Sequence, residues 1–242
     1  MADARQTLPE ASEAGTNPRD DRGGDTSTRT KGERTRQRLL EIAIQRFGRH
    51  GYRSTSVSEI TREAGLTQAA AYAYFPNKEA LFREAVNADA SALVGRVTRE
   101  VDSLPVAMAV GAFLVRLIEE VPKHPLIFRV LSGKEPDAVS ELRSLPAIRR
   151  AGSGLASRLE EAQRRGEVRT DVDPRDVAVG LQTIVLALAV ASLQFGQGRG
   201  RETDGPGDEE GQPVRIADSD VVRGVAAVLD AVLRPADANG KG

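Results

Sequence analysis

The sequence contains no cysteine and no tryptophan, and only two histidines, His50 and His124. Without thiols the chain cannot form a disulfide, a thiolate nucleophile or a cysteine-based zinc site. Two isolated histidines also argue against a histidine-rich metal site and a histidine-dependent catalytic triad. No carboxylate motif at metal-ligand spacing takes their place. The composition therefore argues against an enzyme, and we expect neither a metal nor a cofactor.

An excess of charge is also lacking, because 34 Lys and Arg residues stand against 35 Asp and Glu residues. The distribution is uneven, however. Between Lys31 and Val86, ten basic residues stand against six glutamates, which gives this segment a net charge of +4. A basic segment in a neutral chain is typical of contact with phosphates, although a solvated helix surface would have the same composition.

The chain does not open with the charged and then apolar pattern of a secretory signal. Residues 177–193 are nearly all apolar, but this run is shorter than the ~20 residues of a membrane span. It is also interrupted by polar residues such as Gln182 and Thr183. We therefore expect a cytoplasmic protein that does not enter a membrane. The alternative, a membrane-anchored helical protein, would need detergent to stay in solution.

The most informative pattern lies between residues 56 and 78, SVSEITREAGLTQAAAYAYFPNK. Ser56 and Glu59 have the spacing of a capping box at a helix N-terminus. Gly65 ends this helix, because glycine takes the left-handed conformation at little cost. Thr67 can cap a second helix. Two short helices joined by a glycine turn form a helix-turn-helix unit whose second helix fits a major groove, although such turns also occur in ordinary helical proteins.

The residues around this unit extend the pattern over about fifty residues from Thr35. It includes Leu39, Leu40, Ala43, Phe47, Gly51, Tyr52, Thr55, Ile60, Ala64, Gly65, Tyr72 and the string from Tyr74 to Leu81. This stretch resembles the N-terminal domain of the tetracycline-repressor (TetR) family of transcriptional regulators. The resemblance implies an all-α fold, with an N-terminal three-helix helix-turn-helix domain and a C-terminal helical bundle for ligand binding and dimerisation.

Carried over by position, the resemblance implies DNA contacts at Thr55, Ser56, Thr67, Gln68, Ala69, Ala70, Tyr72 and Lys78. Gln68 is the only long polar side chain at the start of the second helix, and it can bond an adenine edge or a phosphate. Tyr72 and Lys78 match phosphate-contacting residues of the family, although the ring of Tyr72 could also pack in the core. Ala73 stands where an aromatic residue or histidine is common, so DNA shape could supply part of the specificity.

We expect residues 1–30 to be a disordered arm, because they lack apolar periodicity. Residues 31–77 form the predicted DNA-binding domain and residues 78–235 the ligand-binding and dimerisation domain, followed by a tail at 236–242. Residues 196–213, rich in glycine, proline and acid, predict a mobile loop. Helices are expected at about 31–50, 56–64, 67–74, 78–101, 106–120, 126–132, 139–145, 147–165, 174–194 and 217–233.

Apolar side chains of the C-terminal region either line a cavity or simply fill a core. The candidates for an effector pocket are Phe113, Leu117, Ile127, Phe128, Leu131, Gln182 and Val185. The resemblance further implies that the helices at 174–194 and 217–233 pair with those of a second subunit, which would make a four-helix homodimer interface.

These observations and the resemblance together predict a ligand-responsive, DNA-binding transcriptional regulator. Most members of the family are repressors, so we expect a dimer that binds a near-palindromic operator in double-stranded DNA and is released by a small apolar effector. The alternative is a sequence-blind structural DNA-binding protein without an effector. The modest basic charge and the sizeable apolar C-terminal region make this alternative less favourable.

Overall fold

The computed structural model describes residues 30–196 together with Gly224, Ala227, Val228, Ala231 and Leu233. The regular structure in these residues is helical throughout, and this confirms the predicted all-α fold. The α-helices are α1 (Lys31–Ser54), α2 (Val57–Ala64), α3 (Gln68–Tyr72), α4 (Lys78–Val101), α5 (Val106–Glu120), α6 (Pro125–Leu131), α7 (Pro136–Glu141), α8 (Pro146–Arg164) and α9 (Pro174–Gly196), and the 3-10 turns are η1 (Val121–Lys123) and η2 (Leu142–Ser144).

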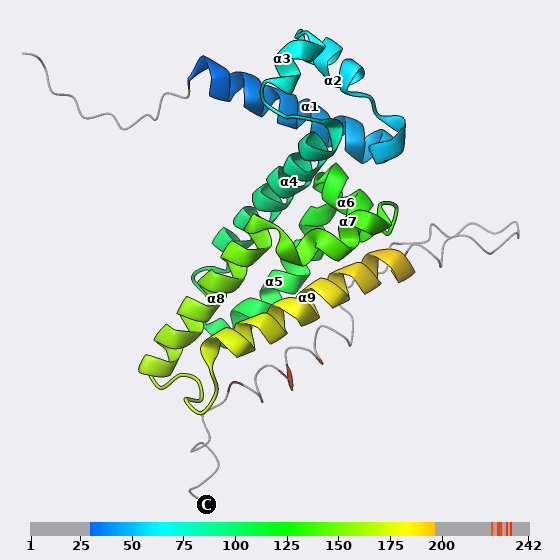
Figure 1. The fold of residues 1–242 in the computed structure, drawn as a ribbon. Helices are drawn as coiled ribbons and strands as arrows, with labels where there is room; N and C mark the ends of the chain where they lie inside the picture. Colours follow the sequence, from blue (N-terminus) through cyan, green and yellow to red (C-terminus); the bar gives the residue numbers. More distant parts are fainter. Residues whose placement is uncertain (1–29, 197–223, 225–226, 229–230, 232, 234–242) are drawn as a thin grey trace, which may run out of the picture.

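The molecule has a small head, made of α1, α2 and α3, and an elongated body (Figure 1). Helix α4 leaves the head and runs down into the body, where α5 and α8 pack against it and α9 packs against α8 and α5. Helices α6 and α7 lie at the upper end of the body, close to the head. The head therefore meets the body through α4 and α6, and both of these helices pack on α1.

Prolines fix the starts of four body helices, α6, α7, α8 and α9. Proline suits the first helical position because the N–H that it lacks would have no partner there. The helix predicted at 139–145 is therefore wrong in its start, since α7 begins at Pro136 and residues 142–144 form a 3-10 turn. The bounds predicted for α4 and α5 are confirmed.

Two glycines set the shape of the head. Gly51 (φ 83°, ψ 169°) breaks α1 where the sequence predicts its end, and one further turn continues to Ser54. Gly65 (φ 70°, ψ 32°) ends α2 in the left-handed conformation and donates its N–H to the carbonyl of Arg62 at 3.2 Å. Both values of φ favour a residue without a Cβ atom.

One continuous buried core runs from the head into the body. It includes Phe47 and Ile60 in the head, Leu81 and Leu93 on α4, and Leu126 on α6, all of which are at most 2% exposed. The predicted boundary at residue 77 is therefore not a gap in the packing. A second, smaller cluster lies at the far end of the body and contains Val106, Ala156, Leu159, Ala162, Val168, Ala178 and Leu233.

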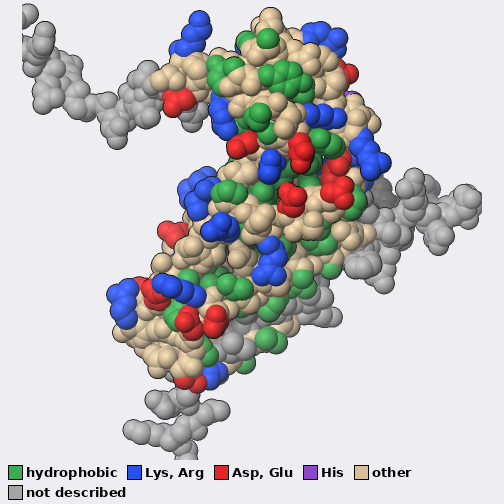
Figure 2. All heavy atoms as spheres, viewed as in Figure 1, with side chains coloured by type: hydrophobic (Ala, Val, Ile, Leu, Met, Phe, Trp, Pro, Cys, Tyr) green, Lys and Arg blue, Asp and Glu red, His purple; other side chains and the backbone are tan. Residues whose placement is uncertain are grey.

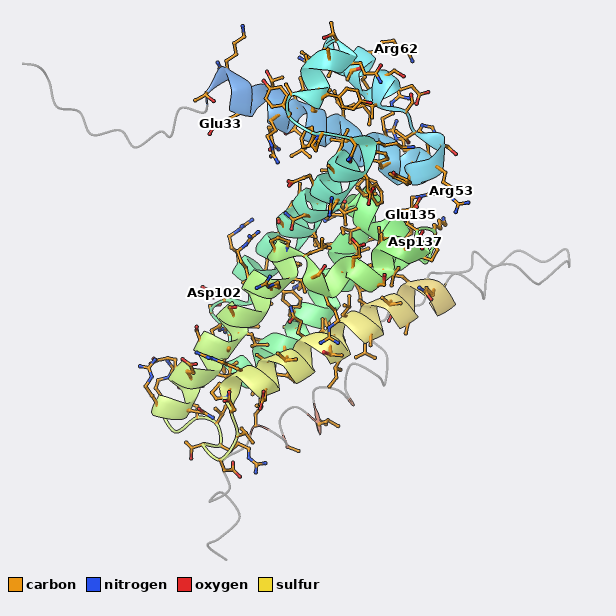
Figure 3. The ribbon with its side chains drawn as sticks, in the orientation of Figure 1. Glu33, Arg53, Arg62, Asp102, Glu135 and Asp137 are labelled. Carbon is orange, nitrogen blue, oxygen red and sulfur yellow. The ribbon has the colours of Figure 1, made fainter. Side chains whose placement is uncertain are left out.

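The backbones of α1 and α6 touch each other. A Cβ atom added to Gly48 would lie 2.8 Å from both the carbonyl carbon and the Cβ of Pro125, closer than atoms can approach. Next to this contact, Glu135 accepts the Tyr52 N–H at 3.0 Å and the Arg129 Nε–H at 2.8 Å. Figure 3 shows Glu135 at this junction, directly below the head. The junction is therefore held by close packing and by a charged hydrogen-bonded group.

A buried carboxylate on α4 fixes the start of α6. The Asp89 Oδ2 atom accepts the N–H groups of Leu126 at 3.1 Å and Ile127 at 3.0 Å, and its Oδ1 atom lies 2.7 Å from His124 Nδ1. His124 precedes α6, as predicted, but its side chain is only 14% exposed. Asp89 thus supplies the cap that α6 lacks from its own N-cap residue.

Several predictions fall on residues outside the described part of the chain. These are the arm up to residue 29, the loop at 197–213, the tail at 236–242 and most of the helix expected at 217–233. The described residues of this last segment are helical. Leu233 is buried, and its carbonyl accepts the Arg169 N–H at 3.0 Å.

We expect Asp89→Ala to lower the free energy of unfolding by about 2 kcal/mol or more, because two buried N–H donors lose their acceptor. Urea denaturation followed by circular dichroism measures this difference. Asp137→Ala, which removes an exposed carboxylate in the first turn of α7, is the matched control and should change stability by less than ~0.5 kcal/mol. Equal effects of the two substitutions would contradict the capping role of Asp89.

Candidate nucleic-acid interface and interior cavity

Helices α2 and α3 form the helix-turn-helix that the sequence predicts. The Ser56 hydroxyl accepts the Glu59 N–H at 3.2 Å while the Glu59 carboxylate accepts the Ser56 N–H at 3.0 Å, so the capping box is complete. After the Gly65 turn, the Thr67 hydroxyl accepts the Ala70 N–H at 3.2 Å and caps α3. Helix α2 packs against the core along one face, and α3 stands out from the head (Figure 1).

Helix α3 is five residues long, and Ala71 is its buried residue. Thr67, Gln68 and Ala69 are exposed, and Ala70 is half-buried. The alternative that Tyr72 packs in the core is wrong, since its side chain is 43% exposed. The Gln68 Nε2 atom donates to the Tyr72 hydroxyl at 3.3 Å, because residues four apart lie on the same helix face. The outward face of α3 thus combines small methyl groups with one amide and one phenol.

The side chain of Thr55 does not reach this face. It is 2% exposed, and its hydroxyl donates to the Gly51 carbonyl at 2.9 Å. This hydroxyl closes the last turn of α1, so the expected DNA contact through the Thr55 side chain is wrong. Its neighbour Ser56 is exposed and lies at the start of α2.

A shallow hollow opens where the end of α1 and the start of α2 meet α3 and α4. It is lined by Arg53, Ser54, Thr55, Ser56, Val57, Ser58, Glu59, Gln68, Tyr72 and Lys78. Four residues expected to contact DNA, Ser56, Gln68, Tyr72 and Lys78, therefore share one surface with Thr55. The Lys78 ammonium lies 4.4 Å from the centre of the Tyr52 ring, which holds this cation at the hollow.

The same hollow is also lined by Arg53, Ser54 and Ser58, none of which was predicted to contact DNA. Figure 3 shows Arg53 at the edge of the head, directed away from the molecule. In the sequence, the sign that these residues belong to the site is one basic residue and two hydroxyl residues close to the capping Ser56. Arg53 and Lys78 give the hollow two cations, and hydroxyl groups lie between them.

Glu59 is the one carboxylate that lines this hollow, and α2 needs it in the charged form. The Ser56 N–H and hydroxyl, which bond its oxygens, hold the pKa of Glu59 below its ordinary value of 4.5. A lowered pKa in the folded state contributes stability above the unfolded pKa, and this contribution is lost as the pH falls through the folded pKa.

The body holds a partly open apolar cavity of about 350 Å³ between α4, α5, α6, α8 and α9. Six of the seven predicted pocket residues line it, namely Phe113, Leu117, Ile127, Leu131, Gln182 and Val185. Phe128 does not line the cavity, so its assignment is wrong. Ile127 and Leu131 are one helical turn apart and share the inward face of α6, whereas Phe128 lies next to that face and packs against the core.

Five lining residues can offer polar atoms to the cavity: Thr98, Asp102, Arg150, Arg158 and Gln182. The Gln182 amide is anchored, because its Nε2 atom donates to the carbonyl of Ile148 on α8. Its Oε1 atom lies 2.8 Å from the point where a Cβ atom on Gly152 would stand, so that glycine makes room for the amide. In the described part of the chain, no group of three or more acidic or histidine side chains is placed to hold a metal ion.

Comparison with known proteins identifies the head. Residues 39–85 match the family model of bacterial regulatory proteins of the tetR family. An HTH-type transcriptional regulator of Bacillus subtilis, YdgC, is 29% identical over 178 residues, which cover 69% of this chain and 86% of that protein. The head is the DNA-binding domain of the TetR family of transcriptional regulators.

Two further comparisons agree with this assignment. The acrEF/envCD operon repressor of Escherichia coli is 45% identical over 58 residues, which cover 23% of this chain and only 26% of that protein. The crystal structure of a TetR-family regulator from Mesorhizobium loti has the same fold, with a TM-score of 0.59 and 21% identity over 84% of this chain and 97% of that one. TetR-family proteins are DNA-binding regulators that typically act as dimers in the cytoplasm.

Helix α9 exposes part of its apolar surface. Residues 174–194 are long and apolar enough to cross a membrane by composition alone, and 22% of this window is buried. Such a helix is weak evidence for a membrane span, since core helices of soluble proteins pass the same test. Val179 and Ile184 are 53% and 44% exposed, so a large apolar surface on α9 is not covered within the described part of one subunit.

We expect Ser56→Ala to destabilise the head by about 1 kcal/mol, because the substitution removes the N-cap of α2. Thermal unfolding at neutral pH measures this loss.

The native chain should be more stable than Glu59→Gln at neutral pH, because the charged Glu59 carboxylate caps α2. This difference in the free energy of unfolding should fade as the pH falls below 4.5 and through the lowered pKa of Glu59. A difference that grows on acidification would contradict the capping box as its source.

Proposed function

We propose that this regulator is a repressor that binds a near-palindromic operator as a homodimer and leaves it when a small apolar effector occupies the body cavity. One observation carries this proposal: α6 contacts both the cavity and the head. Ile127 and Leu131 line the cavity, while Pro125 of the same helix lies against Gly48 of α1. An occupant that displaces α6 must therefore move the head or strain this contact.

On the DNA side, we propose that α3 enters the major groove. Gln68 would bond a base edge, with Thr67 beside it, and Ala69 and Ala70 would offer methyl contacts. Ser56, Tyr72 and Lys78 would contact phosphates in the hollow, together with Arg53. Thr55 would act only by fixing the end of α1, because its hydroxyl is bonded internally.

The dimer would form through α9 and the helix expected at 217–233. The exposed Val179, Ile184 and Val228 belong to these two segments, and a partner's matching helices would cover them. Two-fold symmetry would then place two copies of α3 one DNA turn apart, about 34 Å. We propose the division into a DNA-binding part at 31–77 and a ligand-binding and dimerisation part at 78–235 on the same grounds.

The effector would act by favouring one spacing of the two heads. A ligand shifts an equilibrium only as far as its affinity differs between the two states. The cavity of about 350 Å³ lies at the small end of ligand pockets, which begin near 300 Å³. The name of the Escherichia coli relative, an operon repressor, supports repression as the output.

Selection of binding sites from random duplex DNA tests the proposal directly. With the purified full-length chain at about physiological salt, we expect an enriched inverted repeat whose half-site centres lie about one turn apart. A folded dimer that enriches no sequence would contradict the operator and would favour the sequence-blind alternative. The salt dependence of binding to random DNA would then measure that alternative.

Two substitutions should separate base reading from phosphate contact. Gln68→Ala should change the base preference at one position of each half-site, at a cost of about 1–3 kcal/mol on the preferred sequence. Arg53→Gln should weaken binding to all sequences alike and lower the salt slope by about 1. Fluorescence anisotropy over a salt series measures both quantities, and each variant is the control for the other. Unchanged affinity and base preference in Gln68→Ala would rule out Gln68 as a base contact.

A further inference from the structure

Helices α4 and α8 run side by side in the same direction and form one edge of the cavity. Four hydrogen bonds set their register. Asn87 Oδ1 accepts the Ala147 N–H at 3.2 Å, and Arg150 Nη2 lies 3.4 Å from Ser91 Oγ. Further along, Arg158 Nη2 donates to the carbonyls of Asp102 at 3.2 Å and Leu104 at 2.6 Å. The two helices are therefore joined by hydrogen bonds at both ends of this edge.

Between these ends, α8 carries a glycine that leaves the edge open. Gly154 lines the cavity, yet a Cβ atom built on it would have no atom within 4 Å. It is also exposed to solvent. Gly154 therefore marks an opening between the cavity and the surface. We refer to this opening, at Gly154, as the α8 window.

Two arginines flank the α8 window on the same face of the helix. Arg150, Gly154 and Arg158 follow one another at intervals of four residues, so the two arginines stand about 12 Å apart along the axis. Both line the cavity. Figure 2 shows Lys and Arg side chains along the α4 and α8 edge of the body, with hydrophobic side chains between them.

Neither arginine is neutralised by a carboxylate among the residues that the structure places. Some other arginines of the body are paired with a carboxylate: Arg116 lies 2.8 Å from Glu119, and Arg165 lies 2.6 Å from Glu167. Among the described residues, Asp102 is the one acidic residue in the cavity lining, and Figure 3 shows it at the edge of the body beside α8. Two guanidinium groups and one carboxylate leave the lining with a positive balance.

We propose that the effector is an anionic amphiphile, with an apolar body in the cavity and an anionic headgroup at the α8 window between Arg150 and Arg158. This inference rests on the proposed function, because it names the chemical class of that effector. Guanidinium groups match the planar, multi-oxygen geometry of carboxylates and phosphates. The apolar walls supply affinity for the hydrocarbon, while the window keeps the charged group in water, where its desolvation costs little.

Calorimetric titration of the full-length chain without DNA tests the class of ligand. Dodecanoate and dodecanol have the same hydrocarbon chain and differ in charge. We expect dodecanoate to bind at least about tenfold more tightly, as a charge-assisted hydrogen bond allows. Dodecanoyl-coenzyme A is the third probe. Its tighter binding would identify a phosphate-bearing thioester as the source of the anion, and its failure to bind would identify the free carboxylate.

Four variants locate the headgroup. Arg150→Gln should weaken dodecanoate binding about tenfold and leave dodecanol binding unchanged. Arg149→Gln is the matched control, because Arg149 is adjacent and exposed but does not line the cavity. Gly154→Leu should close the window and weaken both ligands without loss of thermal stability, since the added side chain meets open space. Arg158→Gln also removes two backbone hydrogen bonds, so its unfolding is measured in parallel.

Equal affinity for dodecanoate and dodecanol would overturn the inference, and so would no binding of any of the three probes up to their solubility limits. An equal loss in Arg149→Gln and Arg150→Gln would also overturn it, because a diffuse surface charge would then explain the preference. Release of operator DNA is measured separately. If dodecanoate binds at the window but does not release DNA, the proposed function fails in its coupling step while the site itself stands.

Discussion

The geometry of this molecule depends on the buried carboxylate of Asp89. It lies on α4, the helix that joins head and body, and it holds the first N–H groups of α6 and the ring of His124. A buried acid with a full set of donors is much more costly to disturb than a surface ion pair, because its loss leaves several desolvated groups without partners. Helix α6 is short and has no side-chain cap of its own. Its position against α4 is therefore set by the hydrogen bonds that Asp89 of α4 accepts.

The consequences of this capping reach both functional regions. Helix α6 presents Ile127 and Leu131 to the cavity and Pro125 to the head. At Gly48 no side chain stands between the two helices that could absorb a small shift, so a displacement of α6 has to be taken up by α1 or by the hydrogen bonds of Glu135. In the proposed mechanism, close packing of this kind converts occupancy of an apolar cavity into a change in head position, because packed interfaces move between discrete arrangements and do not deform smoothly.

Local chemistry explains which parts of this structure the sequence could predict. The capping box of Ser56 and Glu59, the left-handed Gly65 and the bounds of α4 and α5 are properties of neighbouring residues, and all four are observed. Long-range packing decided the features that sequence reasoning missed. Thr55 turns its hydroxyl into α1, and Phe128 packs against the core without lining the cavity. The hydrogen bonds between Asp89 and α6 join residues more than thirty positions apart in the sequence, and no local sequence pattern predicts them.

Because α3 has few polar side chains, the proposed DNA specificity depends strongly on the position of the head. Beyond Gln68 and Thr67, its exposed start offers only the methyl groups of alanines, and Tyr72 and Lys78 stand beside the hollow with Arg53. Phosphate contacts give affinity with little sequence information, whereas base-edge contacts give specificity. On the proposed operator, a head with few base-edge groups would draw much of its discrimination from DNA shape and from the spacing of two half-sites. In the proposed dimer this spacing depends on the dimer interface and on the α1–α6 junction. A small movement at Gly48 would therefore cost this protein more of its specificity than it would cost a protein with many base contacts.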